Sequence, residues 1–182
     1  MSILQGVEFY LSKRLGRATI DYQMLEDKDK IAVAVSGGKD SLALLRLLKD
    51  RQSFVPIKYD LLAVHIDLGY PRSCARKLEG YFKKIGVPYH IEKTDVLKKT
   101  NPKEINCFWC SWNRRKALFE TADRFGCTKV ALGHHLDDII ETILLNLFFQ
   151  GEVSAMRPKQ ELFNGKITLI RPLAYIEEYM LA

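Results

Sequence analysis

Residues 31–35 (IAVAV) form an apolar stretch that runs directly into the sequence Ser-Gly-Gly-Lys-Asp-Ser at positions 36–41. A short apolar run bounded by glycines predicts a buried strand, and the residues that follow predict a helix. Two glycines at such a turn let bare backbone N–H groups approach an anion, and the start of the helix adds the positive end of its dipole. The sequence therefore predicts a strand-turn-helix unit with a phosphate site at the turn.

The rest of the chain alternates between short apolar stretches and amphipathic ones. We expect strands at residues 31–35, 61–66, 89–91, 129–132 and 167–170, the last at a sheet edge, and helices at residues 3–24, 40–49, 73–85, 111–125 and 135–149. Irregular segments are expected at residues 92–106 and 151–165. Near-continuous apolar strands separated by helices predict an α/β fold with a doubly wound parallel sheet, which binds ligands beyond the carboxyl ends of its strands.

Length and composition limit the class of protein. With 182 residues, 47% of them hydrophobic, the chain can bury one sizeable core. We expect a helical lead at residues 1–30 and one domain at residues 31–182. Residues 175–179 read as the beginning of a helix, so we expect a fragment or a family member without its last module. The absence of a long apolar run and of a secretory signal predicts a cytoplasmic protein without a membrane span.

Basic residues exceed acidic ones, 28 to 22, which gives a net charge of +6. The excess lies in three clusters: Lys13, Arg14 and Arg17; Arg72, Arg76 and Lys77; and Arg114, Arg115 and Lys116. Such clusters suit a polyanion, and ordinary solvated helix faces are the alternative. Charge alone does not decide between them.

Asp40 is the residue of the glycine run that a simple turn explains least. The run also lacks the four-residue spacer of the Walker loop, so it is not the usual triphosphate cradle. A carboxylate inside an anion pocket repels phosphate unless a cation lies between them. Asp40 therefore predicts a bound Mg²⁺.

Cys107 and Cys110 form a C-x-x-C pair directly before Ser111, which is predicted to cap the helix that ends at Gly126. Two thiols at this spacing can bind one metal, and thiols at a helix N-terminus beside cations ionise readily. One pair supplies only half of a closed zinc site. A metal site, a redox site and a chance spacing all remain open from the residues alone.

Five motifs, in order, resemble the PP-loop ATP pyrophosphatases, and within them the tRNA 2-thiocytidine synthetase family of tRNA thiolation enzymes. The motifs are residues 21–24 (DYQM), 36–41 (SGGKDS), 107–115 (the cysteine pair followed by two arginines), 131–138 (ALGHHLDD) and 171–175 (RPLAY). The resemblance runs over nearly the whole chain, and an ordered set is far more specific than any single motif.

The resemblance implies that a base carbonyl of tRNA attacks the α-phosphate of ATP, pyrophosphate leaves, and sulfur then displaces the adenylated oxygen. It implies nucleotide binding by Ser36, Gly37, Gly38, Lys39, Asp40, Ser41, His65 and Gly133. Lys39 and Arg114 would neutralise phosphate charge, and Asp40, with Asp137 or Asp138, would hold Mg²⁺. For His65, a plain core position is the equally weighted alternative.

The resemblance also implies a [4Fe–4S] cluster with Cys107 and Cys110 as two of its three protein ligands. The third has no match in this sequence, so three alternatives are open: a ligand from elsewhere, substitution by Cys74, or a cluster-free form, with zinc on the pair as a further option. The implied partners are tRNA, ATP and a sulfur donor protein or sulfide, and a homodimer is left open. The competing functions are another PP-loop enzyme, such as a lysidine synthetase or an amide-forming ligase, and a non-catalytic nucleotide- or metal-binding module.

Overall fold

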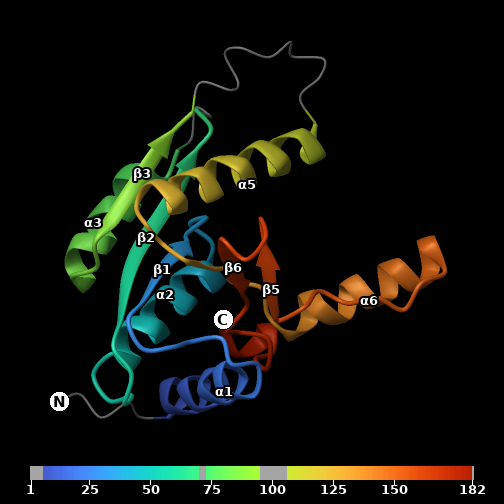
Figure 1. Ribbon diagram of the computed structural model, residues 1–182, viewed down its shortest axis with the longest axis horizontal. Coiled ribbons are helices and arrows are strands. Elements are labelled where there is room, and N and C mark those ends of the chain that lie inside the picture. Colours follow the sequence, from blue (N-terminus) through green and yellow to red (C-terminus); the bar gives the residue numbers. More distant parts are fainter. Residues whose placement is uncertain (1–5, 70–72, 95–105, 182) are drawn as a thin grey trace.

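The computed structural model describes residues 6–69, 73–94 and 106–181, and these form one six-stranded sheet with helices on both faces (Figure 1). The strands are β1 (Asp29–Ala34), β2 (Tyr59–Asp67), β3 (Tyr89–Lys93), β4 (Lys129–Ala131), β5 (Lys159–Leu162) and β6 (Ile167–Ile170). Their order across the sheet is β3-β2-β1-β4-β6-β5. All neighbouring pairs are parallel except β5 and β6, so the doubly wound sheet that the sequence predicts is confirmed with one antiparallel strand added.

Five α-helices and one short 3₁₀ helix accompany the sheet in the described residues. They are α1 (Val7–Asp21), α2 (Lys39–Arg51), α3 (Ala75–Ile85), α5 (Cys107–Arg124), α6 (Leu136–Gln150) and η2 (Glu178–Leu181). Gly86 and Gly126 follow α3 and α5 with positive φ angles of 65° and 66°, as expected for residues that end a helix. None of the described helices is both long and apolar enough to cross a membrane.

Two hydrophobic clusters pack against the two faces of the sheet. Side chains alternate along β1, so Ile31 and Val33 contact one cluster while Ala32 contacts the other. The first cluster contains residues of α1, α2 and α3, and the second contains residues of α5. Because both faces are covered, the central strands are apolar throughout, which explains the continuous apolar runs of the sequence.

The end of the chain differs from the expectations in three ways. Residues 151–165 are not wholly irregular, because they contain β5, whose polar sequence KQEL gives no apolar signal. A turn with positive φ at Phe163, Asn164 and Gly165 reverses the chain, so β6 lies between β4 and β5 and is not an edge strand. Residues 175–179 do not begin an α-helix; the 3₁₀ helix η2 follows at Glu178.

Helix α5 begins four residues before the predicted position. The side chain of Asn106, not Ser111, is the N-cap, and its Oδ1 accepts a 2.8 Å hydrogen bond from the backbone N–H of Trp109. Asn106 was assigned to the irregular segment 92–106, most of which (95–105) lies outside the described residues, as does Arg72. The consequence is that the cysteine pair lies within the first turn of a helix.

Helix α6 extends away from the sheet (Figure 1). His135 and Asp138 form a reciprocal capping box at its start, which confirms a helix from this point. None of its residues is buried, although its sequence LDDIIETILLNLFFQ is strongly apolar. The expected helix is therefore present, but its apolar surface is exposed.

Candidate active site

The glycine run lies between the end of β1 and the start of α2, at the carboxyl edge of the sheet. Gly37 has φ of 98°, in the left-handed region that side chains disfavour, and a Cβ there would lie 2.8 Å from Sγ of Cys74. Glycine is therefore required at this position for both backbone conformation and space.

Two serine hydroxyls hold the loop closed. Ser41 donates a 2.8 Å hydrogen bond to the carbonyl of Gly38, and its Oγ accepts one of 3.2 Å from the N–H of Ser36. Ser36 Oγ accepts a 3.2 Å bond from the N–H of Gly38. Gly38 is the N-cap of α2 and provides no side-chain cap, so the first amides of this helix are available to an anion.

A cavity of about 390 Å³ opens beside this loop. It is lined by Ala34, Val35, Ser36, Asp40, Ser41, Val64, His65, Ile66, Ser111, Arg114, Arg115, Leu118, Phe119, Leu132, Gly133 and His134. The lining comes from the ends of β1 and β2, the glycine run with the start of α2, the segment after β4, and one face of α5. Apolar side chains on one part and polar groups on another are typical of a nucleotide-sized pocket at a topological switch point.

Arg114 and Arg115 bring positive charge into the cavity from α5. Neither guanidinium forms an ion pair with a carboxylate among the described residues. The sequence assigned Arg114 to phosphate binding, whereas Arg115 was noted as part of the same motif and of a basic cluster and was given no role. The sequence did not show which face of the helix Arg115 occupies, because the start of α5 was not known from it.

Asp40 also lines the cavity, and its Oδ1 is buried without a hydrogen-bond partner among the described residues. A buried carboxylate oxygen without a donor is costly unless a cation or a donor from a ligand satisfies it. This geometry fits a Mg²⁺ ligand, and the assignment of Asp40 to magnesium remains a prediction.

His65 is 7% exposed and lines the cavity, so it belongs to both the core and the pocket wall. Its Nδ1 lies 2.7 Å from the carbonyl oxygen of Val35, which makes Nδ1–H the donor of this hydrogen bond. The Sγ of Cys74 lies 4.0 Å from Nε2 of the same ring and 3.8 Å from the carbonyl of Ser36. Cys74 is thus placed against the glycine loop.

Gly133, after β4, lies against the N-terminus of α2. A Cβ at this position would be 3.0 Å from the backbone nitrogen of Ser41 and 3.2 Å from the carbonyl carbon of Asp40. Because both are backbone atoms, any side chain would push the end of β4 away from the glycine loop. Gly133 therefore joins the two walls of the cavity, and it brings His134, which the sequence reasoning did not select, to the cavity surface.

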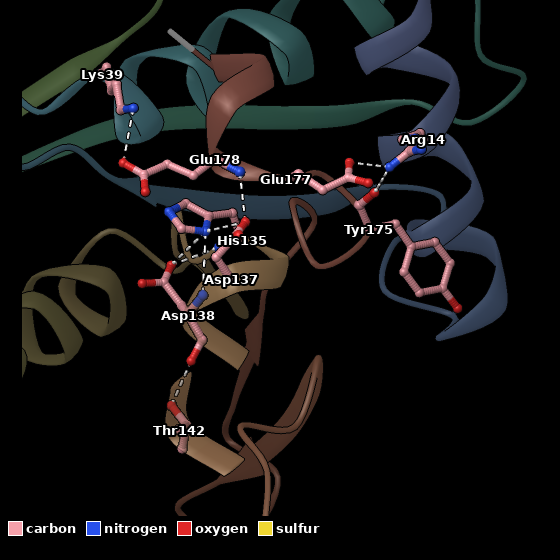
Figure 2. A network of polar contacts seen from close by, with 9 residues as sticks. All are labelled: Arg14, Lys39, His135, Asp137, Asp138, Thr142, Tyr175, Glu177 and Glu178. Carbon is pink, nitrogen blue, oxygen red and sulfur yellow. Dashed lines mark hydrogen bonds and ion pairs between the residues drawn. The ribbon is translucent and has the colours of Figure 1, made fainter. Parts of the chain in front are cut away.

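Lys39, Asp137 and Asp138 do not line the cavity. Lys39 forms a 3.0 Å ion pair with Glu178, whose N–H donates a 2.7 Å hydrogen bond to Asp137 (Figure 2). Asp138 accepts a 2.8 Å hydrogen bond from the N–H of His135. In this structure the two aspartates bind protein groups, and their roles toward Mg²⁺ remain predictions.

Cys107 is exposed and Cys110 is half-buried on the first turn of α5, four to eight residues before the two arginines. Among the described residues, no group of three or more His, Cys, Asp or Glu side chains could hold a metal ion. Cys74 lies at the glycine loop and Cys127 is buried in the core. The described residues thus fit two ligand positions of a cluster and do not by themselves form a complete cluster or zinc site.

The fold and the loop together define a PP-loop domain, and a family model of that description matches residues 11–182. A tRNA-cytidine(32) 2-sulfurtransferase of Geotalea uraniireducens is 44% identical over 172 residues, which cover 92% of this chain and 68% of that protein. Its counterpart in Geobacter sulfurreducens is 44% identical over 183 residues, covering 98% and 71%. That of Acidovorax ebreus is 46% identical over 176 residues, covering 94% and 56%. The chain belongs to this PP-loop family of tRNA-cytidine(32) 2-sulfurtransferases.

Solved structures are similar as well. The U34-tRNA thiolase NcsA of Methanococcus maripaludis, solved with its [4Fe-4S] cluster, superposes with a TM-score of 0.77 at 25% identity, covering 96% of this chain and 61% of NcsA. The NH3-dependent NAD synthetase of Campylobacter jejuni has a TM-score of 0.57 at 12% identity, covering 98% of this chain and 71% of the synthetase, a likeness of fold alone. These similarities confirm the predicted PP-loop fold.

Proposed function

We propose that this chain provides the ATP-dependent activation site of a tRNA sulfurtransferase that forms 2-thiocytidine at position 32. The observation that carries the proposal is the cavity in which the uncapped start of α2, an oxygen of Asp40 and two arginines meet. Within the described part of the chain, that oxygen has no hydrogen-bond partner and the two arginines have no carboxylate partner. Membership of the family supplies the substrate, since the relatives act on tRNA cytidine 32 by name.

In the first step, the O2 carbonyl oxygen of cytosine forms a bond to the α-phosphorus of ATP, and the bond to the bridging oxygen breaks, releasing pyrophosphate. The first amides of α2 bind the leaving pyrophosphate, and Arg114 and Arg115 neutralise the charge that grows on the phosphates. Mg²⁺ held at Asp40 would supply further charge neutralisation when bound. No proton has to be removed, because the attacking oxygen is a carbonyl.

In the second step, a sulfur nucleophile attacks C2 of the adenylated base, and AMP leaves with the former carbonyl oxygen. A sulfur donor protein or sulfide supplies the sulfur. Cys107 and Cys110 would hold a [4Fe–4S] cluster through two thiolates, a further ligand would have to come from outside the described residues, and zinc on the pair is the alternative. The N-terminal position of the pair on α5, on the same helix as Arg114, supports this role.

The pair is tested by Cys107→Ser and Cys110→Ser, with Cys127→Ser as the control because Cys127 is buried in the core and does not line the cavity. We expect both pair variants to lose iron, sulfide and tRNA thiolation and to retain pyrophosphate release from ATP and tRNA. Unchanged thiolation in the pair variants would contradict the sulfurtransferase. Zinc in place of iron in anaerobically prepared protein would favour the alternative metal.

The function as a whole is tested in cells. Deletion of the gene should remove 2-thiocytidine from tRNA, and the intact gene should restore it. An unchanged nucleoside profile would favour another PP-loop enzyme, such as a lysidine synthetase or an amide-forming ligase. Failure to release AMP and pyrophosphate in the presence of tRNA would favour a non-catalytic binding module.

The basic clusters support tRNA binding unequally. Arg14 forms an ion pair with Glu177 and donates to the carbonyl of Tyr175, and Arg17 pairs with Asp21, so these guanidiniums already have partners. The arginines of α5, which face the cavity, remain for the RNA and the nucleotide. A cytoplasmic location agrees with a tRNA substrate and remains a prediction.

We also propose that α6 pairs with α6 of a second copy. Phe148 and Phe149 are 77% and 82% exposed, which leaves on the order of 300 Å² of aromatic surface in water if a whole ring side chain has about 200 Å². Further exposed apolar side chains on and just after the helix are Ile140, Leu144, Leu145, Leu147 and Val153. The exposed apolar area of these side chains together exceeds the few hundred Å² of an apolar patch usual for a monomer. It approaches the ~800 Å² that each partner buries in a stable interface.

Sedimentation of the wild type and of a Leu144→Asp, Phe148→Asp double variant tests the dimer. We expect a dimer for the wild type and a folded monomer for the variant. Ile20→Asp, at an exposed apolar position on α1, is the control and should remain dimeric. A monomeric wild type would contradict the proposal and favour a different cover for α6.

A further inference from the structure

Arg171, directly after β6, is a buried cation without a carboxylate partner among the described residues. The residue is 7% exposed, and its Nη1 donates a hydrogen bond to the backbone carbonyl of Arg157. Its Nε–H donates to Nδ1 of His134 at 3.3 Å. The guanidinium is buried and donates to a carbonyl oxygen on one side and to a ring nitrogen on the other. These two hydrogen bonds fix its orientation.

This contact determines the tautomer of His134. Arginine has no acceptor, so the nitrogen of His134 that faces Nε–H must carry a lone pair. The proton of the neutral ring then resides on Nε2. His134 lines the cavity, so the ring that carries this N–H donor belongs to the wall of the nucleotide pocket.

The surrounding charges keep this ring neutral. Burial lowers the pKa of His134 below its usual value, and the guanidinium of Arg171 acts in the same direction, as do Arg115 and His135, against the opposing carboxylate of Asp138. Burial and Arg115 also lower the pKa of Arg171, to about 10, so Arg171 remains charged at neutral pH. The ring is thus a neutral donor beside positive groups.

The place of His134 indicates what it binds. Its neighbour Gly133 packs against the backbone of Ser41 at the start of α2, and Arg114 and Arg115 line the same cavity. Two guanidiniums, the start of α2 and a neutral N–H donor line one cavity, and among the described residues that line it Asp40 has the one carboxylate. This is the donor pattern that a phosphate oxygen requires.

We propose that Arg171 is a positioning residue that holds His134 as a neutral Nε2–H donor to an α-phosphate oxygen of the bound nucleotide. The proposal rests on the proposed activation of ATP. It excludes His134 as a general base, because Nε2 already carries the proton and Nδ1 is engaged by Arg171. An attacking carbonyl oxygen has no proton to lose, so a donor serves the reaction where a base would not.

The tautomer is tested by NMR of the free chain labelled with ¹⁵N in histidine, with His134→Gln used to assign the signals. We expect the Nε2–H tautomer in the wild type. In Arg171→Gln we expect a mixture of tautomers and a higher titration midpoint for His134. An Nδ1–H tautomer in the wild type, or a tautomer unaffected by Arg171→Gln, would overturn the positioning role.

The donor is tested by single-turnover pyrophosphate release with saturating tRNA. We expect His134→Ala to reduce the rate of pyrophosphate release about 100-fold, as removal of one oxyanion donor does. The KM for ATP should change less than this rate. His134→Gln, whose amide also donates, should recover most of the rate. Thermal unfolding of each variant shows whether the fold is lost. Arg171→Lys keeps the charge but lacks the directed Nε–H, and it gives a second test. We expect its rate of pyrophosphate release to lie between those of the wild type and Arg171→Gln.

The two proposals fail in different ways. If AMP binding shifts the His134 Nε2 signal but no tRNA is thiolated, the nucleotide contact stands and the proposed function fails. If tRNA is thiolated and AMP leaves the Nε2 signal unchanged, the function stands and the His134 contact is overturned.

Discussion

Nζ of Lys39 lies 3.0 Å from a carboxylate oxygen of Glu178, so the lysine of the glycine loop is paired with the last described turn of the chain (Figure 2). Glu178 also donates its N–H to Asp137, which joins η2 to the start of α6. The carboxylate of Glu178 thus lies beside the ammonium group of Lys39. If Lys39 binds a phosphate group, as the motif predicts, that phosphate must compete with Glu178 for the lysine.

Glu178→Gln should release Lys39 and tighten the binding of ATP. Both side chains are about half exposed, and such ion pairs are worth ~0.2–1 kcal/mol, so we expect the KM for ATP to fall by up to about 5-fold. Glu177→Gln is the matched control, since Glu177 pairs with Arg14 instead. Weaker ATP binding in Glu178→Gln would mean that the pair helps to hold the loop in its active form.

Asp40→Asn should abolish the dependence of pyrophosphate release on Mg²⁺ and lower its rate by about 10²–10³-fold. Of the described side chains that line the cavity, Asp40 is the one that offers a buried anionic oxygen without a hydrogen-bond partner. Asp60→Asn, at an exposed position of β2, is the control. Magnesium titration of the initial rate checks the result, and a variant with wild-type magnesium dependence would remove Asp40 from the metal site.

Gly133→Ala should weaken nucleotide binding and destabilise the fold. The added Cβ would lie 3.0 Å from the backbone of Ser41, so we expect a loss of about 1–3 kcal/mol in the free energy of unfolding, as for overpacking, and at least about 10-fold weaker ATP binding. Gly80→Ala, within α3 and with open space around its Cβ, should be neutral or stabilising. Calorimetry and chemical denaturation separate the two effects, and equal behaviour of the variants would contradict the close contact.

Tyr59→Phe should change how the free energy of unfolding depends on pH above 9. Burial raises the pKa of Tyr59 to about 12, against a smaller opposing effect of Arg51, and its hydroxyl donates to the carbonyl of Leu48 at 2.7 Å. The folded state therefore holds this proton more tightly. The stability that it contributes is complete below pH 10 and is lost as the pH rises towards 12.

Between pH 9 and 11 the wild type should lose about 1.4 kcal/mol relative to Tyr59→Phe. The comparison with the variant is necessary, because Arg171, whose pKa is lowered to about 10, gains stability over the same range. Urea denaturation at a series of pH values measures the difference. Tyr179→Phe, at a 77% exposed position, is the control, and parallel curves for wild type and Tyr59→Phe would contradict the prediction.

The motifs identified the glycine loop, Arg114 and Gly133 as parts of one site, and the structure places all three around one cavity. Arg115 and His134 lie within these motifs but were not selected as site residues, because a single sequence does not show which face of a helix or which loop residue turns towards a ligand. Lys39 and Asp137 were assigned to the site from the motif, and the structure places them in contact with Glu178 instead.

By itself, the sequence determined the kind and order of most elements up to α6, since apolar strands, glycine turns and helix ends are local signals that depend on residues a few positions apart. It also determined the phosphate loop, which is a local structure. The antiparallel strand β5, the exposed face of α6 and the Arg171–His134 contact depend on packing between segments distant in the chain. Side-chain direction and burial arise only when the sheet is assembled, and for this reason only the tertiary structure decided them.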